Sequence, residues 1–141
     1  MEYKFFDNLP PEAKQIRTQV FVDEQGFKNE FDHLDSQSIH LVIYQNGKPA
    51  ATGRLYSDNT GFHIGRIAVK KQYRGLGLGA KVISLLEQKA KANSAVHTPK
   101  TLFVSAQVRV KDFYKKQGFT PEGGEYADEG VPHIKMYKKL W

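Results

Sequence analysis

The chain has 141 residues, of which 40% are apolar and 12% aromatic, so we expect one domain over residues 1–141 with enough apolar side chains for a packed core. Cysteine is absent, which excludes disulfide frameworks, thiolate metal sites and a cysteine nucleophile. Lys and Arg number 21 against 15 Asp and Glu, and the net charge of +6 would suit nucleic acid, a membrane surface or a phosphate-rich small molecule.

The sequence carries no pattern typical of a membrane span or a leader. Its longest apolar runs, such as residues 41–44, are far shorter than the roughly 20 residues that a spanning helix needs. Residues 1–4 lack the charged and then apolar pattern of a secretory signal. We therefore expect a cytoplasmic protein with no membrane partner.

The first part of the chain predicts a strand, a helix and a long irregular segment. Glu2–Phe6 alternates loosely in polarity, as strands do, and two prolines then open a run with apolar residues at helical spacing over residues 11–21. From residue 23 to residue 38 the periodicity is lost and acidic residues gather. We expect a long loop there, and long ordered loops in compact domains are often functional.

Three strands in an antiparallel meander are expected next. They cover residues 39–44, residues 49–56 and Phe62–Val69. Asn46-Gly47 is a strong two-residue hairpin signal between the first two.

The second half predicts two helices, each followed by a strand. Leu78–Ala92 has one apolar helical stripe, residues 101–105 read as a buried strand, and a short helix over residues 107–117 stops at Gly118. A strand over residues 133–138 closes the chain. Because antiparallel and crossover connections are mixed, the fold class is α+β or mixed α/β.

A segment rich in glycine and cations lies between the third strand of the meander and the first of these helices. It contains Lys70, Lys71, Arg74, Gly75, Gly77 and Gly79. Glycines let a ligand approach the backbone closely, and the free amides and positive dipole end of the following helix attract an anion. The segment therefore predicts an anion site; the alternative is a glycine-rich connection at a tight packing point.

Two common nucleotide motifs fit this segment poorly. A dinucleotide fingerprint should be followed by an acidic residue at the end of the next strand, but that strand ends near Ser105 without one. A triphosphate-binding loop needs a Gly-Lys-Ser/Thr ending, which is absent.

Two motifs in order resemble those of the GNAT N-acetyltransferases. Arg74-x-x-Gly77-x-Gly79, preceded by Ile67-Ala68-Val69, is similar to the acetyl-CoA signature, and residues 113–119, Phe-Tyr-Lys-Lys-Gln-Gly-Phe, are similar to the second signature. Residues 20–26, Ala106-Gln107 and residues 130–134 add a likeness to the ElaA-like branch of small bacterial members. The resemblance covers the whole chain. It implies a central mixed, mostly antiparallel sheet flanked by helices, with a CoA cleft between the two central strands.

The resemblance also implies the residues that bind acetyl-CoA. They are Ile67, Ala68, Val69, Arg74, Gly75, Leu76, Gly77, Leu78, Gly79, Ala80, Gln107, Tyr114 and Lys116. The amides of the glycine loop would hold the pyrophosphate, and residues 67–69 would pair with the pantetheine arm. Lys111 or Lys116 would meet the adenosine phosphates, and Gln107 stands where many members have Asn.

The resemblance implies that catalysis uses a general acid and a general base. Tyr114 would protonate the departing thiolate, which is uphill by only about 2 kcal/mol between a phenol and a thiol; the alternative is a core tyrosine. Glu24 and His133 rank first as the base, ahead of Asp32 and Asp35. Without cysteine, direct transfer in a ternary complex is the simplest mechanism.

Arg54 and Arg66 lie on adjacent expected strands, where buried arginines need partners. One interpretation pairs them with Asp32 or Asp35. The other gives Asp32, Arg54 and Arg66 to substrate binding, with an arginine holding an acceptor carboxylate.

The leading functional prediction is transfer of the acetyl group from acetyl-CoA to a primary amine of a small molecule or peptide. We expect no metal to take part. A homodimer is one assembly that the resemblance allows, since dimers are common among such proteins. A CoA-binding sensor without turnover is one alternative. A basic nucleic-acid-binding module is another, although the sequence has no recognisable DNA or RNA motif.

Overall fold

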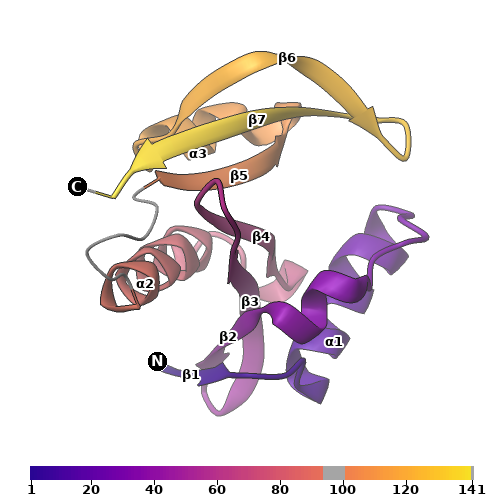
Figure 1. Cartoon of the computed structure of the whole chain (residues 1–141). Coiled ribbons are helices and arrows are strands. Elements are labelled where there is room, and N and C mark those ends of the chain that lie inside the picture. Colours follow the sequence, from indigo (N-terminus) through magenta and orange to yellow (C-terminus); the bar gives the residue numbers. More distant parts are fainter. Residues whose placement is uncertain (94–100, 141) are drawn as a thin grey trace.

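The computed structural model describes residues 1–93 and 101–140, which form a mixed sheet with helices on both faces (Figure 1). The strands are β1 (Glu2–Phe6), β2 (Ile39–Gln45), β3 (Lys48–Ser57), β4 (Phe62–Val69), β5 (Thr101–Gln107), β6 (Thr120–Asp128) and β7 (Val131–Lys139). Their order across the sheet is β1-β2-β3-β4-β5-β7-β6, and every described pair except β4–β5 is antiparallel. This confirms the predicted fold class.

Helical segments connect the strands. They are α1 (Pro11–Arg17), a π-helical continuation (Thr18–Glu24), short 3-10 turns (His33–Gln37, Lys71–Tyr73 and Val108–Val110), α2 (Leu78–Ala92) and α3 (Lys111–Lys116). Side chains of successive strand residues point to opposite faces, so β2 presents Leu41 and Ile43 to one layer and Val42 to the other. Val42 packs in the cluster that contains Ile16 of α1, whereas Leu41 packs with Leu86 of α2.

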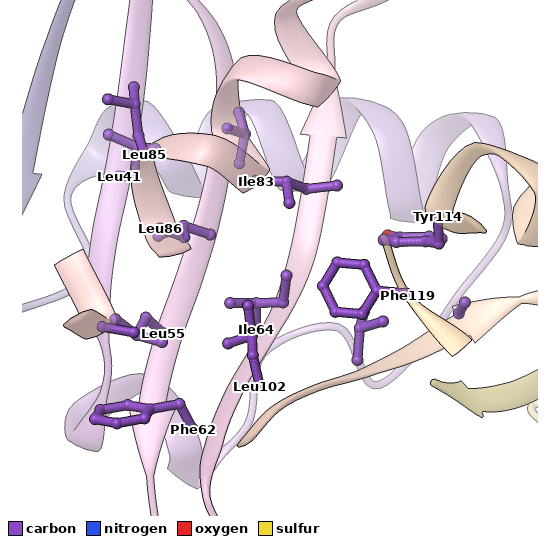
Figure 2. Close-up of a cluster of buried hydrophobic side chains, with 14 of the residues drawn as sticks. Leu41, Leu55, Phe62, Ile64, Ile83, Leu85, Leu86, Leu102, Tyr114 and Phe119 are labelled. Atoms are coloured by element: carbon purple, nitrogen blue, oxygen red, sulfur yellow. The ribbon is translucent and has the colours of Figure 1, made fainter. Parts of the chain in front are cut away.

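The larger core lies between the sheet and α2. Figure 2 shows Ile83 and Leu86 of α2 close to the strands, with Tyr114 and Phe119 at one end of the cluster. Gly53 of β3 allows this close packing, because a Cβ there would lie 2.7 Å from Val82 Cγ1.

The central strands β4 and β5 diverge. They pair in parallel only at Phe62↔Leu102, His63↔Phe103 and Ile64↔Val104. Beyond these pairs, residues 65–69 of β4 and residues 105–107 of β5 form no ladder with each other. The sheet therefore opens along the facing edges of its two middle strands.

A β-bulge in β4 lies beside this opening. Thr52 pairs with Ala68 and Arg54 pairs with Gly65, so two β4 residues lie opposite Gly53 alone. One of them, Arg66, has a φ of 50°, which is unusual for a residue other than glycine.

Most predicted elements are confirmed, and Glu2–Phe6, Phe62–Val69 and Leu78–Ala92 have the predicted bounds. The expected helix over residues 11–21 was too short, because helical backbone continues to Glu24. The long loop expected over residues 23–38 is not irregular throughout, because Asp32 caps a 3-10 turn over His33–Gln37. The strand β6 was missed because most of its residues are exposed, so no apolar alternation marks it.

Candidate active-site cleft

A cavity of about 550 Å³ occupies the opening between β4 and β5. The edge of β4 from residue 65 to residue 69 forms one wall, and Ser105 and Gln107 of β5 contribute to the other. The N-terminal part of α2, the segment around α3, the π-helical turn and the β6–β7 hairpin complete the lining. The predicted cofactor residues Ile67, Ala68 and Val69 therefore all line the cavity.

The glycine loop leads to the N-terminus of α2. Gly75 and Gly77 have φ values of 85° and 77°, a conformation that favours glycine. Gly77 is the N-cap of α2, and no side chain in the described ranges caps this helix end. The first-turn amides of α2 are thus available to an anion. Gly79 has a packing role as well, since a Cβ there would lie 3.3 Å from Phe113 Cζ.

Arg74 connects this loop to the N-terminal segment. Its Nε donates to the carbonyl oxygen of Val69 at 3.0 Å, and its Nη2 donates to the Glu24 carboxylate at 3.0 Å. Glu24, a predicted base, is therefore engaged with the arginine that borders the anion site. Both residues line the cavity.

The expectation that Lys70 adds charge beside the loop was wrong. Its side chain is buried and its Nζ donates to Gln15 of α1. Burial lowers the pKa of this amine. Leu76 and Lys116 are exposed and Leu76, Leu78, Ala80 and Lys116 lie outside the cavity lining, so these predicted cofactor residues do not contribute side chains to it.

Tyr114 lies in the cavity wall at the start of the apolar core. Its side chain is edge-on to both Phe113 and Phe119, and burial raises the pKa of its hydroxyl to about 12. The hydroxyl makes no hydrogen bond to any described protein group. Its oxygen is nevertheless not fully enclosed by the protein. The phenol is thus protonated at neutral pH and open to the cavity.

His133 of β7 also lines the cavity, with its ring held in a defined orientation. It is stacked on Tyr126 at 6.0 Å and lies edge-on to Phe27 at 6.4 Å. Because the carbonyl oxygen of Val131 only accepts hydrogen bonds, the 2.8 Å contact assigns the proton to His133 Nδ1. Nε2 of the neutral ring then carries the lone pair.

Gln107 organises the wall of β5. Its amide nitrogen donates to Gln25 Oε1 at 2.8 Å, and its carbonyl oxygen accepts from Arg109 Nε at 2.9 Å. This predicted cofactor residue lines the cavity and links it to the π-helical turn.

An arginine–carboxylate network lies behind the bulge of β4. It comprises Arg17, Glu30, Asp32, Asp35, Arg54 and Arg66. The predicted substrate-binding residues Asp32 and Arg54 pair with each other at 2.7 Å and lie outside the cavity lining. Of the residues predicted to bind substrate, only Arg66 lines the cavity, and the network adds Glu30 there.

Burial and charge act in opposite directions on the network carboxylates. For Asp32 and Asp35 burial works against ionisation, but hydrogen bonds and charge from arginines outweigh it and lower both pKa values. For Glu30 burial dominates and raises the pKa, although Arg66 and Arg17 oppose it. Sequence reasoning missed Arg17 and Glu30, because nothing in the sequence marks which arginine meets which acid.

The irregular segment and the β6–β7 hairpin are joined at the rim of the cavity. The backbone N–H groups of Lys28 and Asn29 donate to the two carboxylate oxygens of Glu129, at 2.9 and 3.1 Å. These hydrogen bonds lower the pKa of Glu129. The contact spans about a hundred residues of sequence and holds Phe27 near His133.

Comparison with known proteins places this architecture in a family. The model of the acetyltransferase (GNAT) domain matches residues 8–140. The N-acetyltransferase YjcF of Bacillus subtilis is 33% identical over 130 residues, which is 90% of each chain. The chain therefore belongs to the GNAT acetyltransferases and is an acyltransferase.

Solved structures agree. ElaA of Escherichia coli is 25% identical, with a TM-score of 0.85 over 98% of this chain and 99% of that one. An acyl-CoA N-acyltransferase from Pseudomonas aeruginosa is 26% identical, with a TM-score of 0.84 over 97% and 98%. The predicted GNAT fold and the predicted likeness to ElaA are thus confirmed. None of the helices in the described residues is long and apolar enough to cross a membrane.

Proposed function

We propose that this chain transfers the acetyl group of acetyl-CoA directly to a primary amine of a small molecule, in a ternary complex within the cleft. The observation that carries the proposal is the divergence of β4 from β5 beside the uncapped N-terminus of α2, with Tyr114 in the same cavity. The acyl-CoA N-acyltransferase named above supports an acyl-CoA donor.

The cofactor half of the cleft fits CoA by its backbone. Amides of residues 75–80 would hold the pyrophosphate at the helix terminus, where the positive dipole end favours an anion. The unpaired edge of β4 at residues 67–69 offers N–H and C=O groups to an extended amide chain such as pantetheine. Arg74, which is 43% exposed, can reach an anion while its Nε stays on Val69.

Two side chains of the cavity lining, Tyr114 and His133, would carry out the proton transfers of the proposed reaction. The amine nitrogen forms a bond to the acetyl carbon, the carbon–sulfur bond breaks, and one proton leaves the amine while the thiolate gains one. Tyr114 keeps its proton at neutral pH and donates it to the thiolate. His133 accepts the amine proton at Nε2, directly or through a water molecule, because its Nδ1 proton is held by Val131.

His133 is preferred to the other predicted bases by its contacts. Glu24 is paired with Arg74, and Asp32 and Asp35 are held by arginines outside the cavity lining. The arginines lower the pKa values of Asp32 and Asp35, which makes these two carboxylates weaker bases.

The test is a screen for CoA release from acetyl-CoA over a broad panel of primary amines, with mass spectrometry of the acetylated product. We expect acetyl-CoA to bind and at least one small amine to be acetylated. Binding of CoA without release over the whole panel would refute transfer and favour a sensor. Steeply salt-dependent oligonucleotide binding without CoA binding would favour a nucleic-acid module.

A further inference from the structure

The surface where the arginine–carboxylate network meets the cavity is the part of the molecule that acetyl transfer, as proposed above, leaves unexplained. Glu30 is only 4% exposed and Arg66 is partly exposed, and both line the cavity. Their side chains are adjacent, with Arg66 Nε 3.2 Å from Glu30 Oε2. Arg66 Nε also donates to the carbonyl oxygen of Glu30 at 3.0 Å.

The hydrogen bonds within the network leave two accessible polar atoms free, besides the enclosed Nε of Arg54, which also has no partner among the described residues. Glu30 Oε2 accepts from Arg17, but Glu30 Oε1 has no hydrogen-bond partner among the described residues. Arg66 Nη2 donates to Asp32, but Arg66 Nη1 has no partner in the same part of the chain. The protein does not fully enclose either Glu30 Oε1 or Arg66 Nη1, so both atoms are accessible.

The other two arginines of the network differ in this respect. Each side-chain nitrogen of Arg17 donates to Glu30 or Asp35. Both terminal nitrogens of Arg54 donate to Asp32 or Asp35. Arg17 and Arg54 are therefore structural, whereas Arg66 presents an unused guanidinium edge.

Backbone geometry supports a role for Arg66 beyond packing. Its left-handed φ of 50° is unfavourable for a side chain of this size, and such outliers persist where the surroundings enforce them, often at functional sites. The bulge of β4 that produces this φ also turns the side chain towards Glu30 at the cavity wall.

We propose that Glu30 and Arg66 form the recognition subsite for the acceptor, and that the acceptor is a free α-amino acid. Arg66 Nη1 would donate to the α-carboxylate, and Glu30 Oε1 would accept a hydrogen bond from the α-amine, the nitrogen that becomes acetylated. The two side chains are in contact, with Arg66 Nε 3.2 Å from Glu30 Oε2, and one carbon atom joins the amine and the carboxylate of an α-amino acid, so one small ligand can meet both side chains. This assignment rests on the proposed function.

Charge balance favours a zwitterion over a simple amine. The network contains three guanidinium groups and three carboxylates, so it is neutral when all are ionised. A ligand of one net charge would leave that charge uncompensated in a partly enclosed cavity, which is costly. A zwitterion gives each free atom an opposite partner and leaves the site neutral on binding. Its ammonium then releases one proton to water, and the neutral amine attacks as described above.

The test compares the common L-α-amino acids with two kinds of analogue: the α-amides and the decarboxylated amines, such as phenylethylamine for phenylalanine. CoA release is measured with acetyl-CoA and the full chain. We expect at least one amino acid to exceed both analogues in kcat/KM by about tenfold or more, since a charge-assisted hydrogen bond is lost in each analogue. Equal turnover of the analogues would overturn the subsite and leave the proposed function intact.

Variants connect the preference to the residues. Arg66→Gln should abolish the preference for the carboxylate mainly through KM, and Arg66→Lys should retain part of it. Arg54→Gln is the matched control: it also removes a network arginine, but it should lower Tm and leave the ratio of amino acid to amine turnover unchanged. A preference that survives in Arg66→Gln would refute the assignment. If Arg66→Gln does not fold, Arg66→Lys and the wild-type comparison decide.

A binding measurement separates this inference from the proposed function. In the presence of CoA, the amino acid that is turned over best, or each amino acid if none is turned over, should raise Tm more than its decarboxylated amine does. A rise without any CoA release would retain the subsite and reject transfer. No difference between the amino acids and their amines would reject the subsite.

Discussion

The two halves of the cleft are built from different parts of the polypeptide. The half proposed to hold the cofactor consists mainly of backbone: the free edge of β4, which lines the cavity, and the neighbouring glycine loop with the first turn of α2, of which Arg74 and Gly79 line it. The half proposed to hold the acceptor consists of side chains from distant segments, among them Glu30, Arg66 and His133. A site made of backbone suits one constant ligand, and a site made of side chains can change its specificity by substitution.

The largest expected effect concerns the Tyr114 hydroxyl, which is proposed to protonate the CoA thiolate as the acceptor amine attacks. Tyr114→Phe should lower kcat by about 10²–10⁴-fold, the usual contribution of a positioned acid. The affinity for CoA should change little, because the hydroxyl contacts no described protein group and the ring remains in place. Rapid-quench or steady-state kinetics with calorimetry of CoA binding measure both quantities. Tyr56→Phe, on β3 and outside the cavity lining, is the control; a normal kcat in Tyr114→Phe would remove its role as acid.

The second prediction isolates the cofactor half. Gly77→Val should weaken acetyl-CoA binding on the order of 10–100-fold, since a β-branched residue at a φ of 77° is strained. Nothing lies within 4 Å of a Cβ built there, so no clash with the protein is expected, and the valine would instead crowd the first-turn amides of α2 that are proposed to hold the pyrophosphate. Gly47→Val is a matched control, because Gly47 has the same φ in the β2–β3 turn. Equal CoA affinities of both variants, measured by calorimetry, would argue against the glycine-loop site.

A third prediction isolates the acceptor half. Glu129→Gln weakens the hydrogen bonds that join the hairpin to Lys28 and Asn29, so KM for the acceptor should rise a few-fold while the affinity for CoA stays the same. Glu125→Gln on β6 removes an exposed carboxylate that has no partner among the described residues, and it should behave like wild type. An unchanged KM in Glu129→Gln would show that this contact does not position the rim.

The smallest expected effect is on stability against acid, and it concerns the arginine–carboxylate network behind the cleft together with His40, which contacts it. Burial lowers the pKa of His40, whose Nε2 donates to the carbonyl oxygen of Asp35. Histidine in the unfolded chain has a pKa of about 6.5. Below that pH, the unfolded chain binds a proton that the folded chain does not, so the free energy of unfolding decreases as the pH is lowered. The pKa values of Asp32 and Asp35 are also lowered in the folded chain. Below about pH 4 their protonation therefore favours the unfolded chain, and the free energy of unfolding decreases a second time.

Thermal unfolding as a function of pH measures these two steps. His40→Gln should flatten the first step and leave the second. His33→Gln, which alters an exposed ring, should preserve both. A first step that persists in His40→Gln would assign it to another group.

The same contrast explains what the sequence could predict. Arg74, Gly77 and Gly79 form one contiguous motif, and the structure places them at the N-terminus of α2, as expected. A local motif of this kind depends on backbone conformation, which glycine itself determines. The helices and inner strands were predictable for a similar reason, since burial imposes a periodic apolar pattern.

The acceptor half could not be derived in this way. Glu30 meets Arg66 only because a bulge shifts the register of β4, and no sequence signal marks that bulge. Glu24 was expected as a base, and its partner is Arg74, fifty residues away. Lys70 was assigned to the anion site by proximity in sequence, but the chain turns its side chain towards α1. Pairings between distant side chains require the fold.

The central claim is that this cleft moves an acetyl group from acetyl-CoA to an amine nitrogen. The most direct test is to supply acetyl-CoA that carries an isotopic label in the acetyl group, together with the best acceptor from the amine screen. We expect the label to appear on the amine nitrogen of the product in step with the release of free CoA thiol, and we expect Gly77→Val and Tyr114→Phe both to suppress it. Release of thiol with all of the label recovered as free acetate, or no release from bound acetyl-CoA, would contradict it.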